Sequence, residues 1–170
     1  MRSKLTSNLG VNFFVIDMDL VCEKMTKQQY MDMYAIVGAA MEVYNTLGRG
    51  MEELIYQEAL QIELENRGIK VDKEVWLDMY YKGQKLKKRY KADFVVNEII
   101  VELKSVSIFS SEHRAQLFNY MRITKQKRGI LMNFGGRSFA SERYWYQEED
   151  DDFVLLKESN YRDYVNMSSK

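Results

Sequence analysis

The first part of the chain carries apolar residues at helical spacing. Over residues 27–47 they recur every three or four positions, which predicts an amphipathic helix that stops at Gly48. A second helix is expected over residues 51–67, with Gly68 as its C-terminal stop. Residues 1–26 show no sustained period, and we expect an N-terminal arm of undefined structure there.

The middle of the chain changes to patterns typical of β-strands. Three strands are expected, at residues 71–81, 86–96 and 99–106. Ser110 or Ser111 can cap a helix that continues to about residue 124. The short, continuous apolar run 129–134 then indicates a buried strand.

The end of the chain is less regular. Residues 138–146 favour a short helix, residues 153–156 a last strand, and residues 157–170 form a C-terminal tail. A three-stranded meander followed by a helical crossover implies an α/β fold, in which a mixed β-sheet has helices on its faces. We therefore expect a single domain over residues 27–156, which suits a chain of 170 residues.

The composition excludes several classes of protein. Apolar residues make up 46% and charged residues 29% of the chain, as in soluble globular proteins. No apolar run approaches the roughly 18 residues of a membrane helix, so no membrane association is expected. The single cysteine, Cys22, excludes an internal disulfide framework and fits a cytoplasmic location. The single histidine, His113, excludes a metal site built from several histidines.

Charge is distributed unevenly although the net charge is zero. Residues 82–91 hold six basic side chains and no acid, whereas residues 148–152 are five consecutive acids. The basic stretch is a candidate phosphate-binding surface, or a solvated hairpin whose lysines protect a sheet edge. The acidic stretch is expected to be a solvated loop.

The stretch ADFVVNEIIVELK, residues 92–104, reads as an apolar hairpin interrupted by charges. If Asn97 and Glu98 form a two-residue turn, Asp93 lies directly opposite Glu102. Alternation then divides the side chains between two faces. One face is apolar and holds Ala92, Phe94, Val96, Ile99, Val101 and Leu103, and the other holds Asp93, Glu102 and Lys104.

Two carboxylates at the spacing of a directly opposed pair repel each other. Lys104 cannot neutralise both, whereas a hard divalent cation can, and Mg²⁺ typically takes one or two carboxylates and keeps waters. The alternative is a salt-bridged, exposed hairpin face without a metal. The apolar character of both strands favours the metal site.

Two helices carry further polar residues at matching positions. Gly50, Glu53 and Tyr56 have G-x-x-E-x-x-Y spacing, which puts Glu53 and Tyr56 on one helical face. Glu53 can instead interact with the helix dipole alone. In the later helix, a polar stripe is formed by His113, Gln116 and Tyr120, which also suits a solvent-facing side.

Taken in order, several segments resemble the GxxExxY protein family of the PD-(D/E)XK nuclease superfamily. They are GMEELIYQEAL, RGI, YYKGQKL, ADFVV, IVELK, EHRAQLFNYM and NFG, over about residues 30–135. The resemblance implies a restriction-endonuclease-like core of helix, three-stranded meander, helix and strand. The turn at Asn97 and Glu98 is shorter than in typical relatives, and Tyr44 stands where relatives often carry histidine.

The resemblance also implies a metal site. Asp93 matches the motif aspartate and Glu102 the acid of the E-x-K motif, while Glu53 matches a supplementary helical glutamate. The backbone carbonyl of Leu103 would be a further ligand. One or two Mg²⁺ ions, with Mn²⁺ as a substitute, are therefore expected.

The remaining residues receive roles by the same resemblance. Lys104 would act as general base or stabilise charge on the phosphorane, and Gln116 and Tyr120 match a Q-x-x-x-Y motif. The side chains expected to contact nucleic acid are Lys85, Lys87, Lys88, Arg89, Tyr56 and His113.

The function expected from these motifs is a metal-dependent nuclease of low sequence specificity, with DNA favoured over RNA. Three alternatives stay open: a binding module on a nuclease fold that does not cut, a metal hydrolase of small phosphoesters, and an assembly protein. In the last case Tyr30, Tyr34 and Tyr44 of the first helix would form a homodimer, which is also compatible with nuclease activity.

Overall fold

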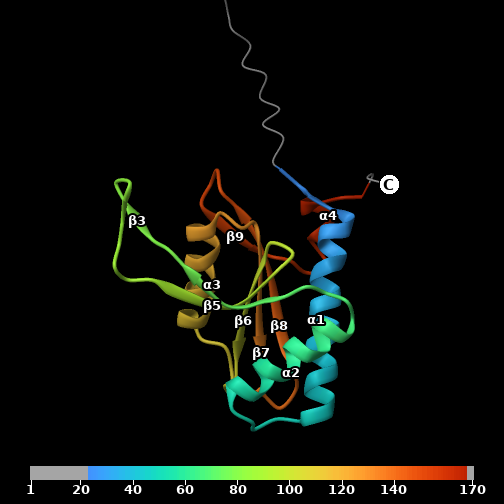
Figure 1. The fold of residues 1–170 in the computed structure, drawn as a ribbon. Coiled ribbons are helices and arrows are strands. Elements are labelled where there is room, and N and C mark those ends of the chain that lie inside the picture. The colour runs from blue at the N-terminus through green and yellow to red at the C-terminus, as the bar shows by residue number, and fades with distance from the viewer. Residues whose placement is uncertain (1–22, 168–170) are drawn as a thin grey trace, which may run out of the picture.

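A six-stranded mixed sheet forms the centre of the computed structural model, which describes residues 23–167 (Figure 1). Its strands lie in the order β2-β5-β6-β7-β8-β9. Their bounds are Asp72–Leu77 (β2), Tyr90–Val96 (β5), Ile99–Lys104 (β6), Arg128–Asn133 (β7), Ala140–Gln147 (β8) and Asp152–Leu155 (β9). Only β6 and β7 are parallel among these neighbours, because a helix connects them.

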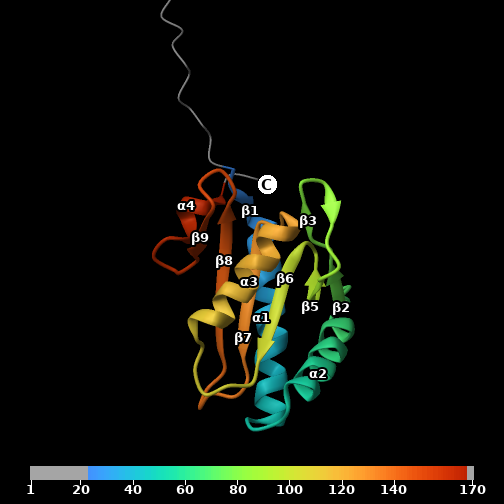
Figure 2. The ribbon, with the colours of Figure 1, turned by 90° about the vertical axis from the view of Figure 1, so that its left-hand side faces the viewer.

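Helices cover both faces of this sheet (Figures 1 and 2). Helices α1 (Lys27–Leu47) and α2 (Glu53–Asn66) lie on one face, and α3 (Ser111–Thr124) lies on the other. Each interface has its own buried cluster, one including Phe94 and Val101 and the other Ile100, Leu117 and Leu131. The expected α/β fold, a mixed sheet with flanking helices, is confirmed.

The helix ends follow the local sequence. Thr26 caps α1 through a capping box with Gln29, and the helix stops at Gly48, whose φ is 71°. Ser110 caps α3 in the same way, with His113 as its partner. The predicted positions of these three helix ends are therefore confirmed.

The turn between β5 and β6 has the predicted length. Asn97 and Glu98 both adopt positive φ, 47° and 61°, as the two-residue turns of hairpins require. The register of the two strands pairs Val96 with Ile99 and Phe94 with Val101. The ladder between the two strands ends at Phe94, one position before Asp93.

The predicted apolar face of this hairpin needs one correction. Phe94 packs against α1 and α2 as expected, but Ala92 belongs to the cluster on the α3 side. Neither ladder of β5 includes Asp93, and Glu74, near it on β2, has a φ of 54°. An interrupted, bulge-like position of this kind changes which face the following side chains point to.

The predicted short helix at residues 138–146 is wrong, because this segment forms most of β8. Three consecutive aromatic residues of β8 are buried: Trp145 on the α1 side, and Tyr144 and Tyr146 on the α3 side. A strand buried on both faces lacks the alternation of polar and apolar residues that identifies a surface strand.

The predicted strands at 71–81 and 86–96 are each shorter in the sheet. The end of the first, β3 (Tyr80–Tyr81), instead pairs with β4 (Gln84–Lys85), which lies between the two predicted strands, and the two form a separate hairpin. A glycine at position 83, with a φ of 78°, lies in its turn.

The domain continues past its predicted C-terminal end. After β9, helix α4 (Tyr161–Tyr164) leads into β10 (Val165–Asn166), which pairs in parallel with β1 (Met25–Thr26). Both Met25 and Val165 are buried in the α1-side cluster. Residues 1–22 of the expected arm and 168–170 of the expected tail lie outside the described residues.

The tyrosines of α1 contact the rest of the domain. Tyr30 stacks on Tyr161 with 4.8 Å between ring centroids, and the hydroxyl of Tyr44 donates to the carbonyl of Gly136 at 3.1 Å. Tyr34 is partly exposed. Over residues 23–167, no helix has the length and apolar character needed to cross a membrane.

The tight turn gives a first prediction. Glu98→Gly should raise the free energy of unfolding by about 0.5–1 kcal/mol, because a left-handed conformation costs a residue with a side chain about 1–2 kcal/mol. Urea denaturation measures the change. Glu98→Ala is the control. It removes the ion pair between Glu98 and Arg128 (3.7 Å) but keeps a side chain at a position with positive φ. Equal effects of both variants would contradict the assigned turn.

Candidate active site

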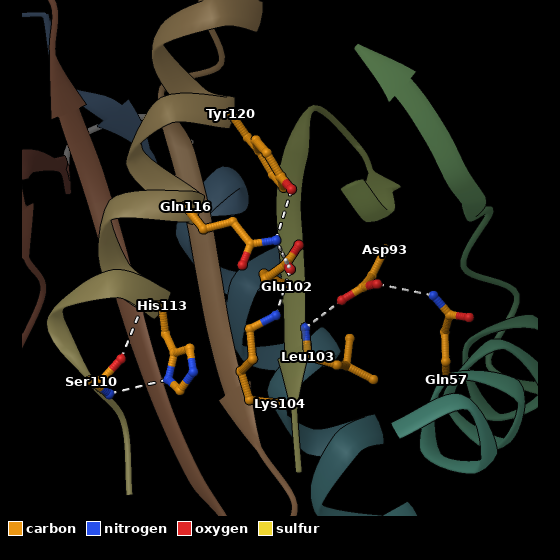
Figure 3. A network of polar contacts seen from close by, with 9 residues as sticks. All are labelled: Gln57, Asp93, Glu102, Leu103, Lys104, Ser110, His113, Gln116 and Tyr120. Carbon is orange, nitrogen blue, oxygen red and sulfur yellow. Dashed lines mark hydrogen bonds and ion pairs between the residues drawn. The ribbon is translucent and has the colours of Figure 1, made fainter. Parts of the chain in front are cut away.

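The site lies where β5 and β6 separate, with α2 and α3 on its two sides (Figure 3). Asp93 of β5 fills the gap left by the interrupted ladder. Its Oδ2 accepts a hydrogen bond from the amide of Leu103 at 2.7 Å, and its Oδ1 accepts one from Nε2 of Gln57 at 3.1 Å. The carboxylate is therefore held between β6 and α2.

Glu102 is the most buried acid of the site, with 2% of its surface exposed. Its Oε1 accepts hydrogen bonds from Nζ of Lys104 and Nε2 of Gln116, both at 2.7 Å. The same Nε2 lies 2.7 Å from the hydroxyl of Tyr120. Gln116 and Tyr120 thus face Glu102 (Figure 3).

The second oxygen of Glu102 has no hydrogen-bond partner among the described residues, although it is buried. An unpaired buried acceptor costs about 1–3 kcal/mol, and more when it is charged. Such groups are rare in native proteins, and a bound ion or water is a common reason for them. The free oxygen of Glu102 is therefore available to a ligand.

The pKa shifts of the site show that its two carboxylates are short of positive charge. Burial raises the pKa of Glu102 to about 7, and the negative charges of Asp93 and Glu53 act in the same direction. Burial also raises the pKa of Asp93. For Lys104, burial acts to lower the pKa, but the charge and hydrogen bond of Glu102 outweigh it, so the pKa rises.

The donors fit a hard divalent cation. Asp93 and Glu102 supply two carboxylates, the number that Mg²⁺ typically takes from a protein. The amide of Leu103 points to Asp93, and N–H and C=O of one residue in an extended strand point to the same side, so the carbonyl of Leu103 is also directed away from β7. These three groups form the candidate ligand set.

Glu53 is not joined to this set by direct contact. Across residues 23–167, no group of three His, Cys, Asp or Glu side chains is placed to hold a metal together. Glu53 opens α2, and its charge acts on Asp93, Glu102 and Lys104. Its role as a third carboxylate ligand stays a prediction.

Two residues expected to contact nucleic acid have structural roles in the fold. Tyr56 is fully buried, stacks on Phe134, and donates its hydroxyl hydrogen to the carbonyl of Gly48 at 2.7 Å. No surface of Tyr56 remains for a nucleic acid, which corrects that expectation. Nδ1 of His113 accepts from the amide of Ser110 at 3.1 Å in the cap of α3.

The four basic residues predicted to bind phosphates lie in or beside the β3–β4 hairpin. Lys85 and Arg89 form ion pairs with Asp78 at 2.6 and 2.7 Å. Lys87 and Lys88 are exposed and have no hydrogen bond or ion pair in the described part of the chain.

Gln57 is the site residue that the sequence motifs did not single out. It follows Glu53 by four positions, and residues four apart share one face of a helix. This spacing was the available signal. Gln57 is buried, and its amide fixes the orientation of Asp93.

The family model of the PD-(D/E)XK nuclease superfamily matches residues 30–144, more than half of the chain. The chain belongs to the PD-(D/E)XK nuclease superfamily. The segment Glu102-Leu103-Lys104 supplies the (D/E)-x-K part of that name, and Asp93 its aspartate, preceded here by alanine where the name has proline.

Other comparisons add little to this assignment. A crystal structure of SSO0001 is 20% identical in sequence, with a TM-score of 0.44, and the match covers 63% of this nuclease-superfamily chain and 52% of that protein. The matched part is thus about half of SSO0001. Comparison with curated proteins gives no match.

The raised pKa of Glu102 predicts a pH-dependent stability without metal. Its pKa is about 7 in the folded protein against an ordinary 4.5, so the folded state retains a proton that the unfolded chain loses between these values. Stability should therefore fall as pH rises from 4.5 to 7, by on the order of 3 kcal/mol. Urea denaturation in EDTA across this range measures it.

Glu102→Gln should remove most of this pH dependence, because glutamine has no proton to release. Glu149→Gln, which changes an exposed acid of the β8–β9 loop, is the matched control and should leave the dependence in place. The same change of stability with pH in wild type and Glu102→Gln would contradict the assigned protonation of Glu102.

Proposed function

We propose that the protein is a metal-dependent nuclease that hydrolyses phosphodiester bonds of nucleic acid. The observation that carries the proposal is the buried carboxylate of Glu102. One of its oxygens is held by Lys104 and Gln116, and the other has no hydrogen-bond partner among the described residues. Membership of the nuclease superfamily supports the same conclusion.

Asp93, Glu102 and the carbonyl of Leu103 would hold Mg²⁺, with Mn²⁺ as a substitute and Glu53 as an additional acid near a second ion. Bound there, the ion would lower the pKa of a water molecule and polarise a phosphate oxygen. The protein's own contribution is the fixed orientation of its donors. Leu103 and Gln57 fix Asp93, while Gln116 and Lys104 fix Glu102.

Lys104 acts in this proposal as a positive charge and not as the general base. Its pKa is raised, so the ammonium form dominates at neutral pH. An ammonium beside the carboxylates is suited to stabilise negative charge that develops on a phosphate in the transition state. Tyr120 and Gln116 are positioning residues, because they reach the site through Glu102.

The substrate is proposed to be a nucleic acid, with DNA favoured over RNA. Lys85, Lys87, Lys88 and Arg89 lie on or beside the hairpin that extends from the strands next to the site, where they can contact phosphates. His113 begins the predicted contact stripe of α3. Phosphate contacts carry no base information, so low sequence specificity follows.

The narrower family is also part of the proposal. Gly50, Glu53 and Tyr56 reproduce the motif for which the GxxExxY family is named. The hydroxyl of Tyr56 bonds to Gly48 and Met51 in the α1–α2 loop, directly before Glu53 opens α2, and this supports the proposal. A cytoplasmic location accords with the single cysteine, Cys22.

Cleavage assays test the catalytic proposal. Labelled single- and double-stranded DNA and RNA are incubated with Mg²⁺, Mn²⁺ or EDTA. Asp93→Asn and Lys104→Met should each lower the cleavage rate at least about 100-fold, because each removes a group that acts on the transition state. The control is Lys157→Met, which replaces an exposed lysine outside the candidate site. This variant should cut as wild type does.

The outcomes separate the open alternatives. Wild-type rates in both site variants would overturn the assignment of the active site. Metal-dependent binding of nucleic acid without cleavage under any condition would favour a non-catalytic binding module. Hydrolysis of a small phosphodiester but of no polymer would favour a small-molecule phosphoesterase.

Metal binding has a readout that does not depend on activity. Mg²⁺ should raise the unfolding temperature of wild type, because a ligand that binds only the folded state stabilises it. The rise should be larger at pH 8 than at pH 5.5, since protons compete for Glu102 and Asp93. Differential scanning calorimetry of wild type and Asp93→Asn tests this, and equal rises in both would exclude Asp93 as a ligand.

A further inference from the structure

Strands β2 and β5 lead away from the sheet into a projecting hairpin, here called the arm, which comprises residues 78–89 (Figures 1 and 2). It is a paired ribbon: Tyr80 pairs with Lys85, Tyr81 with Gln84, and the amide of Leu86 donates to the carbonyl of Met79 at 2.8 Å. Every residue from 80 to 89 is exposed. The arm therefore contributes almost nothing to the core.

The arm nevertheless carries large aromatic side chains. Tyr80 and Tyr81 are each 63% exposed, and Trp76, on β2 just before the arm, is 55% exposed. Consecutive residues of a strand point to opposite faces, so the ribbon presents one tyrosine on each face. Burial in the domain does not explain these rings, and each ring face is accessible to a ligand.

Positive charge surrounds each ring. Nζ of Lys82 lies 5.5 Å from the centre of the Tyr81 ring, and Lys85 is the cross-strand partner of Tyr80. Arg89 and Lys91 lie over Trp76 at 5.1 and 5.6 Å. The arm holds five basic residues and one acid, Asp78, which is a net charge of +4.

Asp78 divides the basic residues into two groups. It pairs with Lys85 and Arg89, which stabilises the base of the ribbon. Lys82, Lys87 and Lys88 have no ion pair within the described residues, so their charges are available to a ligand. Flat rings next to unpaired ammonium groups match a ligand that alternates flat bases with phosphates.

We infer that the arm binds single-stranded nucleic acid, with bases stacked on Tyr80 and Tyr81 and phosphates held by Lys82, Lys87 and Lys88. The inference deepens the proposed nuclease function, on which it rests, by assigning the form of the substrate. A duplex keeps its base faces stacked on one another, so the tyrosine rings would have nothing to stack on. An acidic protein would engage the lysines but leave the rings unused.

The arm is joined directly to the candidate active site. At its base, the ring of Tyr90 lies 5.6 Å from that of Tyr120, whose hydroxyl is linked through Gln116 to Glu102. From Tyr90, where β5 begins, to Asp93 the strand rises by roughly 10 Å at about 3.3 Å per residue, which a few nucleotides of a single strand can span. A strand held on the arm would thus reach the site a few nucleotides away.

Fluorescence anisotropy in EDTA tests the inference, because cleavage is blocked while binding is measured. The probes are a labelled 20-nucleotide single-stranded oligodeoxythymidylate, an oligouridylate of the same length, and a 20-base-pair DNA duplex. Tyr80→Ala/Tyr81→Ala should weaken binding of the single strands at least about tenfold. Tyr80→Phe/Tyr81→Phe is the matched control and should bind as wild type does, since the rings remain.

The lysines have a separate readout in the salt dependence of binding. Lys82→Gln/Lys87→Gln/Lys88→Gln should reduce the slope of log K against log salt by about 2, at about 0.7 per phosphate contact on a single strand. An unchanged slope would exclude these lysines as phosphate contacts. All substituted positions are exposed, and unchanged thermal unfolding confirms that each variant is folded.

The outcomes decide the inference independently of catalysis. Wild-type affinity of the alanine variant for single strands overturns it, as does duplex binding that is tighter than single-strand binding and insensitive to the tyrosines. Full competition by polyglutamate would assign the arm to acidic proteins instead. If the alanine variant fails to bind single strands but Lys104→Met cuts like wild type, the arm stands and the proposed active site fails. Comparison of the two single strands shows whether DNA or RNA is preferred.

Discussion

The hydrogen bond between the amide of Leu103 and the carboxylate of Asp93 occupies the place where a backbone carbonyl of β5 would otherwise pair with β6. A side chain in this position ends the ladder without leaving the amide unsatisfied. The strands separate beyond it, and the freed edge of β6 faces α2. The arrangement of the site, from Gln57 to the carbonyl of Leu103, depends on this hydrogen bond, in which a side chain replaces a backbone acceptor.

The resulting site is electrostatically costly for the protein alone. Two carboxylates lie in a largely buried position, where the charge of Lys104 acts on both and that of Lys91 also acts on Asp93. A proton on Glu102 reduces this cost when no ion is present, and a divalent cation would remove it at neutral pH. Stability and function are therefore opposed here, since the charges that would hold the metal weaken the fold without it.

The hairpin, the site and the arm are parts of one continuous pair of strands. Beyond Asp93, β5 runs through Ala92 and Tyr90 into the arm, while β2 runs beside it through Trp76. The interruption at Asp93 and Glu74 changes the direction of side chains between the site and the base of the arm. One pair of strands thus connects the proposed active site with the proposed substrate-binding arm.

Local sequence determined the features that depend on neighbours in the chain: both capping boxes, the stop at Gly48, and the two-residue turn at Asn97 and Glu98 with its register. Only the tertiary structure decided the features that depend on burial by distant segments. The segment 138–146 forms a strand because both its faces are covered. Tyr56 is buried in the core. Gln57 contacts Asp93 because α2 packs against the hairpin. Periodicity reports which side of an element is apolar, but not which other element will cover it.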